Sequence, residues 1–201
     1  MATPVTPEIE KRSIVVKVEQ RAADGKSTVA GYAAVFGEVA DIGGYFHEVI
    51  ARGAFTNTIK IADVRAYFDH NRGRVLGRSS SGTLRLSEDN KGLAVEIDLP
   101  DTTDGRDVRE LISRGDVTGM SFGFRVLRQE WDEISDPPKR TILEVELDEV
   151  SIVSEPAYDG AQIALRSLEE AKKEKRQHNF SAAQTRLRMK ATLDLKSRSK
   201  A

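Results

Sequence analysis

The sequence predicts an α+β domain built on an antiparallel β-barrel or β-sandwich, followed by a basic tail. Three observations support this prediction. Seven short segments rich in β-branched and aromatic residues are separated by turn residues. Two segments between them have the periodicity of helices instead. The chain has 201 residues, which is one domain of ordinary size with room for a tail.

Several of the predicted strands alternate apolar and polar residues, as strands with one buried face do. The connection SEDNKG, residues 87–92, has the composition of a hairpin turn between the fourth and the fifth strand. The seven segments are 13–20, 27–37, 63–70, 82–89, 92–99, 119–131 and 140–153.

Two helices are predicted between the strands. The first covers residues 50–61, IARGAFTNTIKI, and the second covers residues 103–115, TDGRDVRELISRG. The second has acidic residues in its first turn and Gly115 where a C-terminal cap belongs. The apolar residues that share a face are Ile50, Ala54, Phe55 and Ile59 in the first helix, and Val108, Leu111 and Ile112 in the second.

The composition excludes several kinds of functional site and distinguishes a C-terminal tail from the rest of the chain. Cysteine is absent, which excludes disulfides, thiolate metal sites and a cysteine nucleophile. No run of about 18 apolar residues and no secretory signal is visible, so we expect no membrane span. Residues 166–201 carry 11 basic and 4 acidic residues, whereas residues 1–165 carry 20 basic and 28 acidic residues. The tail has the composition of a solvated, partly disordered segment, and Phe180 is its one aromatic residue, which disfavours a nucleic-acid arm.

Ser121 lies between two glycines in the predicted strand GMSFGFRVL, although glycine weakens strands because it packs nothing. Met120 and Phe122 belong to the apolar face, so Gly119, Ser121 and Gly123 share the opposite face. That arrangement leaves room for another extended chain to lie across the hydroxyl. The alternative is a plain edge strand with a small, exposed face. The Gly-x-Ser-x-Gly pattern itself is coincidental, because a nucleophile elbow needs a helix directly after the serine.

A serine hydroxyl needs a base to act as a nucleophile, and histidine is the natural base near neutral pH. The chain has three histidines, His47, His70 and His178. His178 lies in the basic tail, and for His47 we expect a surface or packing role. His70 ends a predicted strand and opens a turn, a common location for site chemistry. Asp69 is adjacent, but neighbours in a strand point to opposite faces, so it is a weak candidate for orienting His70.

The segment ILEVELDEVSIV, residues 142–153, changes phase at Asp148–Glu149. Before this pair, Leu143, Val145 and Leu147 are apolar at odd positions. After it, Val150 and Ile152 are apolar at even positions. Such a slip predicts a β-bulge or a sharp twist, which often re-aims a side chain beside an active site. An acid re-aimed here would complete an arrangement with a serine and a histidine. The alternative is a solvated acidic pair on an edge strand.

Five sequence blocks in one order together resemble the HK97-type prohead proteases of tailed phages. The blocks are AGYAAVFGEV, HEVIARGAF, YFDHNRGRVLGR, GMSFGF and LDEVSIVSEPAY. The resemblance implies a mainly antiparallel closed β-barrel of about seven strands with a few surrounding helices, like that of the related herpesvirus assemblins. We accordingly divide the chain into a flexible N-terminus at 1–11, a protease domain at 12–166 and a basic, weakly helical or disordered tail at 167–201.

The resemblance also implies a Ser-His-Glu catalytic triad. The serine of the MSFGF block, Ser121, would be the nucleophile, and the histidine of the DHN block, His70, would be the general base. The acid of the EVS block, Glu149, would orient the histidine. The herpesvirus relatives use a second histidine for this third role, and this chain has none at that point. Asp148 is the second candidate for this acid, because a bulge leaves open to which face of the strand its side chain points.

The implied activity is that of a serine endopeptidase of procapsid maturation, which cleaves the scaffolding segment of the major capsid protein and itself. An extended substrate strand would lie over Gly119 and Gly123. The implied partners are the capsid protein and its scaffolding segment, with the portal and a second copy of this chain as further candidates, inside the procapsid in the bacterial host cytoplasm. We expect no cofactor, metal, membrane or nucleic-acid partner. The alternative function is a non-catalytic capsid-assembly or scaffolding module on the same fold.

Overall fold

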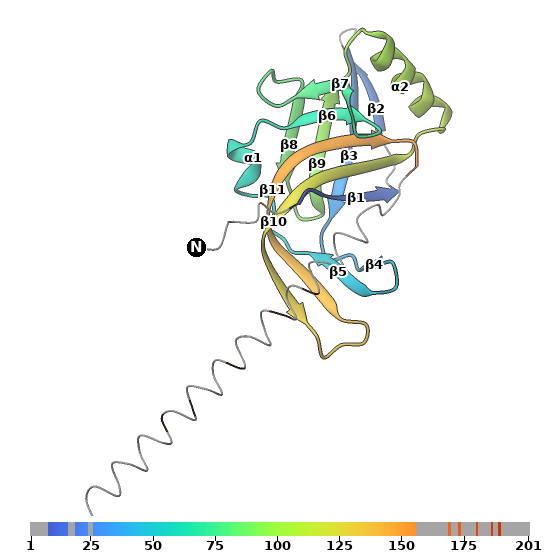
Figure 1. Cartoon of the computed structure of the whole chain (residues 1–201). Helices are drawn as coiled ribbons and strands as arrows, with labels where there is room; N and C mark the ends of the chain where they lie inside the picture. Colours follow the sequence, from blue (N-terminus) through green and yellow to red (C-terminus); the bar gives the residue numbers. More distant parts are fainter. Residues whose placement is uncertain are drawn as a thin grey trace, which may run out of the picture. The chain divides into compact units, whose positions relative to one another are not determined.

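The structure is a computed structural model, and it describes residues 8–15, 19–23 and 26–155 together with positions 169, 173, 180, 186 and 189. The chain divides into two compact units, residues 1–162 and 163–201. The first unit holds the strands and helices described below (Figure 1). The five isolated positions in the second unit are helical. The rest of the predicted tail, and the predicted flexible N-terminus up to residue 7, lie outside the described residues.

Seven strands form a mixed sheet around one long hairpin. The hairpin strands, β10 and β11, pair antiparallel, and the edge strand β1 pairs antiparallel with β10. β11 has two parallel neighbours, β5 beside residues 139–142 and β6 beside residues 149–152. β4 pairs with β5, and β7 pairs with β6. The bounds are β1 Glu10–Val15, β4 Ala40–Ile42, β5 Phe46–Ile50, β6 Arg65–Phe68, β7 Asn71–Arg78, β10 Gly119–Asp132 and β11 Lys139–Val153.

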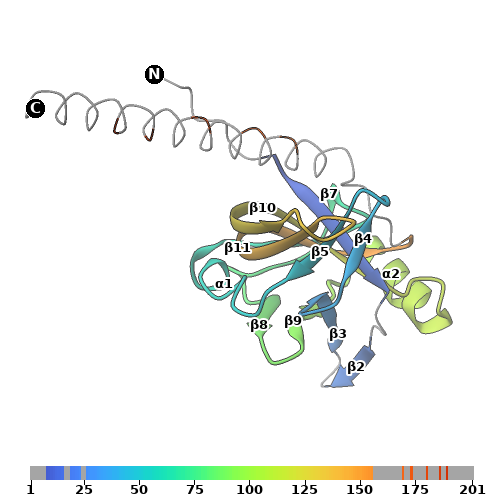
Figure 2. The same ribbon diagram turned by 90° about the horizontal axis from the view of Figure 1, so that it is seen from below.

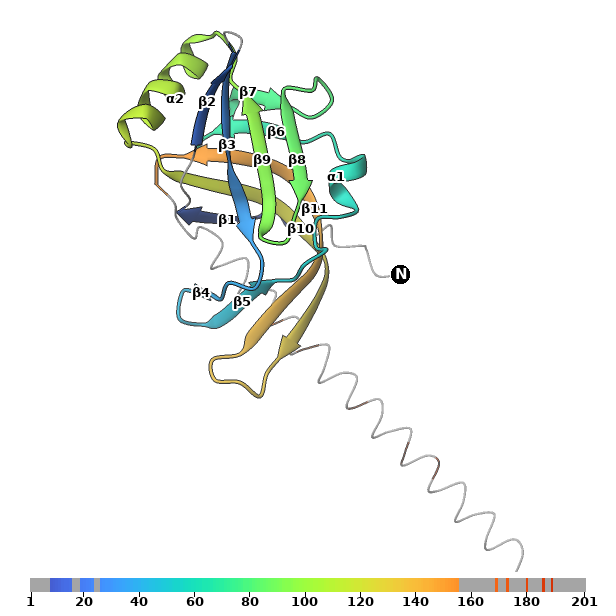
Figure 3. The ribbon, with the colours of Figure 1, turned by 180° about the vertical axis from the view of Figure 1, so that it is seen from behind.

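Four further strands form an antiparallel sheet in the order β2-β3-β9-β8. The predicted turn at 87–92 is confirmed as the β8–β9 hairpin, in which the Asp89 carboxylate accepts from the backbone amides of Lys91 and Gly92. This sheet lies against β10 and β11 as a second layer (Figures 2 and 3). The bounds are β2 Glu19–Ala23, β3 Lys26–Val35, β8 Leu84–Glu88 and β9 Gly92–Asp98.

Both sheets contribute to one hydrophobic core. Val29 from β3 and Ile97 from β9 belong to the same buried cluster as Phe122 from β10 and Ile152 from β11. The rings of Phe55 and Phe122 meet edge to face, with their centroids 5.5 Å apart. Val145 and Leu147 before Asp148 belong to this core, and so do Val150 and Ile152 after it, so the predicted change of phase keeps both sides of the segment 145–152 facing the core.

One predicted helix is confirmed and the other is wrong in most of its length. α2, Thr103–Arg114, begins at Thr102, whose side chain accepts from the Gly105 amide, and ends at Gly115 in the left-handed conformation. The first predicted helix, 50–61, is helical only at α1, Thr58–Ile61. Residues 51–57 instead form turns, because Gly53 adopts a positive φ of 89° that breaks helical geometry.

The expected closed barrel of about seven strands is not formed. Within the described residues, β7 pairs only with β6 and β8 only with β9, so the hydrogen-bond ladder ends at these strands and does not close. The connection at residues 79–83 satisfies its polar groups in a turn, with the Gly82 amide donating to the Ser79 carbonyl and the Arg78 amide to the Thr83 hydroxyl. The predicted strand 13–20 is likewise divided, since β1 and β2 belong to different sheets. In the described part of the first unit, the fold is mainly β with two helices.

Candidate active site

Ser121 lies on β10, between β1 and β11. It is directly opposite Ser13 of β1 and Ser151 of β11, so the three serines share one face of the sheet. Met120 and Phe122 point to the core, as their alternation predicted. Ser121 itself is fully buried, with none of its surface exposed. The described state therefore gives solvent no direct access to the hydroxyl.

His70 is presented by a tight turn between β6 and β7. Asp69 and His70 both adopt positive φ values, 48° and 55°, as the two central residues of a type I′ hairpin turn do. The turn is fixed to the end of β11, because the Asp69 amide donates to the Ile152 carbonyl and the Asp69 carboxylate accepts from the Ser154 amide at 2.7 Å. Asp69 thus binds Ser154 and positions the turn, whereas the acid that contacts the His70 ring comes from β11.

The predicted bulge is present and it separates the two candidate acids. Gly123 of β10 pairs with Glu149, and the next residue, Phe124, pairs with Leu147, which leaves Asp148 as the extra residue. Asp148 accepts a hydrogen bond from Arg72 at 2.7 Å at the surface. Glu149 points to the face that carries Ser121, as its pairing with Gly123 requires.

The Glu149 carboxylate is held at both oxygens. Its Oε1 lies 2.5 Å from Nδ1 of His70, and its Oε2 accepts the Ser151 hydroxyl at 2.6 Å. The side chains are 5% exposed for Glu149 and 16% exposed for His70. A Cβ atom added at Gly123 would lie 2.8 Å from Oε1 of Glu149. The absence of a side chain at Gly123 therefore makes room for this carboxylate.

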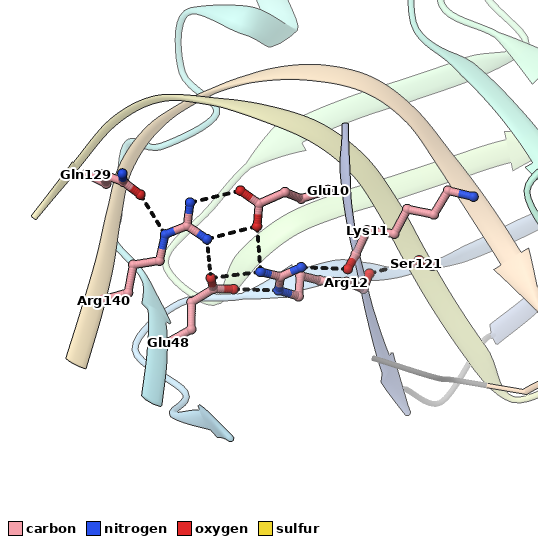
Figure 4. A network of polar contacts seen from close by, with 7 residues as sticks. All are labelled: Glu10, Lys11, Arg12, Glu48, Ser121, Gln129 and Arg140. Carbon is pink, nitrogen blue, oxygen red and sulfur yellow. Dashed lines mark hydrogen bonds and ion pairs between the residues drawn. The ribbon is translucent and has the colours of Figure 1, made fainter. Parts of the chain in front are cut away.

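The Ser121 hydroxyl donates to the backbone carbonyl of Arg12 on β1, at 2.9 Å (Figure 4). In the part of the chain that the structure describes, His70 and Glu149 are joined to each other, and Ser121 is joined to β1. The prediction that Gly119 and Gly123 line the substrate stays a prediction.

A buried charge cluster holds β1 beside the serine. We use this name for Glu10 and Arg12 of β1, Glu48 of β5 and Arg140 of β11 (Figure 4). Arg12 binds both oxygens of Glu48, at 2.6 and 2.9 Å, and also Glu10 at 2.7 Å. Arg140 binds Glu10 twice at 2.8 Å and Glu48 at 2.9 Å. Two acids and two bases thus satisfy one another away from water, and they tie three strands together.

The charges of the cluster change the acidity of its members. Burial alone raises the pKa of Glu10, but the hydrogen bonds and charges of Arg140 and Arg12 outweigh it, so this pKa lies below its usual 4.5. Burial likewise lowers the pKa of Arg12, and Glu48 and Glu10 outweigh that effect and raise it. Both groups are therefore more firmly charged than they are in water.

Among the described residues, no group of three or more histidine, aspartate or glutamate side chains is placed to hold a metal ion. Their helices include none long and apolar enough to cross a membrane.

Two contacts in this site were not predicted in the sequence analysis. Ser151 binds Glu149, and the Arg12 carbonyl accepts from Ser121, 109 positions along the chain. The spacing of two between Glu149 and Ser151 places both on one face of a strand, and this signal was available in the sequence. The pairing of β1 with β10 had no comparable local signal.

Comparison with known proteins identifies relatives. The prohead protease of Enterobacteria phage HK97 is 32% identical over 165 residues, which cover 79% of this chain and 69% of the relative. The prohead protease of Escherichia phage T5 is 34% identical over 103 residues, which cover 51% of this chain and 45% of the relative. The solved structure of the bacteriophage T4 capsid assembly protease aligns with 72% of this chain and 98% of its own, at 8% identity and a TM-score of 0.45.

A protein-family model also matches most of the chain. The model of the Caudovirus prohead serine protease family covers residues 13–174, a span that contains His70, Ser121 and Glu149. This match extends over both sheets. The chain therefore belongs to the Caudovirus prohead serine proteases, and it is a serine peptidase of phage capsid maturation.

Proposed function

We propose that this chain is the endopeptidase that cleaves the scaffolding segment of the major capsid protein, and itself, with Ser121 as nucleophile, His70 as general base and Glu149 as the orienting acid. The observation that best supports the proposal is the contact of 2.5 Å between His70 and Glu149. Glu149 lies on β11, the strand that pairs with the strand of Ser121. A hydroxyl, an imidazole and a carboxylate in series are the combination that activates serine for acyl transfer.

The contact with Glu149 fixes the tautomer of His70. An ionised carboxylate only accepts hydrogen bonds, so Nδ1 of His70 carries the proton that is shared with Glu149. Nε2 is then the basic nitrogen, as a general base requires. Asp148 is the less suitable acid, because it binds Arg72 at the surface.

Catalysis begins when the Ser121 hydroxyl exchanges its acceptor, from the Arg12 carbonyl to Nε2 of His70. Ser121 Oγ then attacks the carbonyl carbon of the scissile peptide, and its proton passes to His70. His70 returns this proton to the leaving amine, and Glu149 stabilises the imidazolium between the two transfers. Water activated by His70 releases the acyl group from Ser121. Ser121 must also become accessible to the substrate, since the residue is fully buried in this structure.

The partners follow from the proposed reaction. The major capsid protein and its scaffolding segment are the substrates, and the enzyme acts inside the procapsid, in the host cytoplasm, where the portal is a further neighbour. A homodimer is compatible with the chain. The substrate enters as an extended strand over Gly119 and Gly123. The basic tail after residue 166 serves either packaging into the procapsid or self-removal.

The test is co-expression with the cognate capsid protein, followed by gel analysis and intact mass measurement of both chains. We expect wild type to shorten the capsid protein and itself, and Ser121→Ala to leave both at full length. Glu149→Gln should slow processing by about 10⁴-fold, as loss of the correct histidine tautomer does.

Asp148→Asn is the matched control, because it removes the neighbouring acid, and it should process at a rate close to wild type. If Asp148→Asn is inactive and Glu149→Gln is active, the acid is assigned wrongly. Full-length products with wild type, in particles that assemble and expand normally, would instead favour the non-catalytic assembly module.

A further inference from the structure

Ser151 faces the nucleophile from the neighbouring strand. It pairs directly with Ser121 in the β10–β11 ladder, and none of its surface is exposed. Its hydroxyl donates to Oε2 of Glu149 at 2.6 Å, while Oε1 of the same carboxylate contacts His70. We propose that Ser151 is a positioning residue for the catalytic reaction, which acts by fixing the Glu149 carboxylate toward His70. This inference rests on the proposed triad.

A glutamate side chain is flexible, so its carboxylate needs more than one hydrogen-bond partner if it is to keep a histidine in one orientation. Rotation about the last side-chain bond of Glu149 is restricted when both oxygens are bound, one by His70 and one by Ser151. The distance of 2.6 Å is typical of a hydroxyl that donates to a charged oxygen, and such bonds are about twice as strong as neutral ones. The Ser151 hydroxyl therefore selects one carboxylate orientation among several.

In the part of the chain that the structure describes, Oε2 of Glu149 has no second donor. The Glu149 side chain is 5% exposed, and among the described residues Ser151 is the one that donates to this oxygen. Without the hydroxyl, a buried carboxylate oxygen would lack a partner, and the side chain would turn toward another donor or toward water. Either movement weakens the contact with Nδ1 of His70.

A merely structural role of Ser151 makes a different prediction. If Ser151 only satisfied a buried polar group, its removal would lower stability and leave the turnover of the folded enzyme unchanged. If it positions Glu149, its removal lowers kcat with little change in KM, because substrate contacts are intact. The effect should also disappear when Glu149 itself has been changed.

Ser13 offers a matched control. It lies directly opposite Ser121 on the other neighbouring strand, β1, and it is buried like Ser151. Its hydroxyl makes no hydrogen bond with Glu149 among the described contacts. Ser13→Ala removes the same atom from the same face of the sheet at an equal register position, so it reports the general cost of changing a serine here.

The experiment measures initial rates of cleavage of purified cognate capsid protein, over a range of its concentrations, for wild type, Ser151→Ala, Ser151→Thr and Ser13→Ala. We expect Ser151→Ala to lower kcat by about 10- to 100-fold, the loss that one hydrogen bond to a charged group accounts for. Ser151→Thr keeps the hydroxyl and should recover most of the rate, and Ser13→Ala should match wild type. Ser151→Ala combined with Glu149→Gln should be no slower than Glu149→Gln alone.

Proton NMR supplies a readout that needs no substrate. The Nδ1 proton of His70 in contact with a carboxylate gives a strongly downfield signal, which Ser151→Ala should shift or broaden and Ser13→Ala should leave in place. Ser151→Cys, close in size to serine, replaces Ser151→Ala in both measurements if the alanine variant does not fold. An unchanged signal and an unchanged kcat in a folded variant overturn the positioning role.

His70→Ala separates this inference from the proposed function. If His70→Ala is inactive and Ser151→Ala has the kcat of wild type, the triad stands and the positioning role is wrong. If His70→Ala retains the wild-type rate, or wild type itself does not cleave, the triad fails and the role of Ser151 fails with it.

Discussion

Gly123 illustrates how one missing side chain shapes the site. The glycine is directly opposite Glu149 in the ladder, and the space where its Cβ would lie is filled by the glutamate side chain. The nearest atom, Oε1 of Glu149, also contacts His70. A methyl group here would therefore compete with the carboxylate for the position from which it orients the base.

We predict that Gly123→Ala lowers kcat at least about tenfold, because a Cβ atom 2.8 Å from Oε1 must displace the carboxylate. Capsid-protein cleavage and thermal unfolding should be measured together. Gly73→Ala is the control, since a Cβ there would meet only the Asn71 side chain, at 3.2 Å. Equal activity of Gly123→Ala and wild type would mean that Glu149 can orient His70 from a second position.

At the scale of elements, the β10–β11 hairpin joins the site to the buried charge cluster. Ser121 and Glu149 lie near the open end of the hairpin, and Arg140 lies near the end where the two strands are connected. Arg140 and Arg12 share Glu10 and Glu48, so the cluster connects the hairpin to β1 (Figure 4). β1 in turn supplies the carbonyl that the Ser121 hydroxyl contacts. The position of the edge strand therefore depends on a few charges that lie away from the triad.

We predict that Arg12→Met lowers the free energy of unfolding by about 3–5 kcal/mol, the usual result when one partner of a buried ion pair is removed. Two buried carboxylates, Glu10 and Glu48, would lose one of the two donors that they share, and only Arg140 would still bind both. Urea unfolding measures the change. Arg106→Met, which removes an exposed pair with Asp101, should cost only about 0–1 kcal/mol. Similar losses in both variants would show that the cluster adds no special stability.

At the scale of the whole molecule, the buried charge cluster makes the free energy of unfolding depend on pH. The pKa of Glu10 lies below its usual 4.5 because Arg140 and Arg12 outweigh the effect of burial. A carboxyl group with a lower pKa in the folded state stabilises the fold above its unfolded pKa, and this stabilisation is lost as the pH falls through the folded value. The loss begins near pH 4.5 and continues below it.

We therefore expect the free energy of unfolding of wild type to fall steeply as the pH is lowered from 5 to 3. Glu10→Gln should be less stable than wild type at pH 7, since it leaves Arg12 and Arg140 with less negative charge, and it should show a shallower decline in acid. Denaturant unfolding at several pH values gives both slopes. Parallel curves for the two proteins would assign the acid sensitivity to other carboxylates.

Local sequence patterns predicted the parts of the site that depend on neighbours in the chain. The alternation around Ser121 assigned the faces of β10, the phase change at Asp148 predicted the bulge, and Gly115 marked the end of α2. The type I′ turn at Asp69–His70 was missed because its residues lack the glycine that usually marks such turns. The division into two open sheets and the contact of Arg12 with Ser121 depend on pairings between distant segments, which no local pattern specifies.

The bulge has a consequence for how homologous chains can differ in length. Asp148 is the extra residue between Leu147, which faces the core, and Glu149, which faces the site. A chain that lacked this residue would still place its neighbours on the same two faces, because strict alternation would then run through them. Loss of Leu147 would instead place Asp148 on the core face, and loss of Glu149 would place Asp148 on the face of the site. Among relatives, alignment gaps in this segment should therefore collect at the position of Asp148, and Glu149 should lie beside every gap.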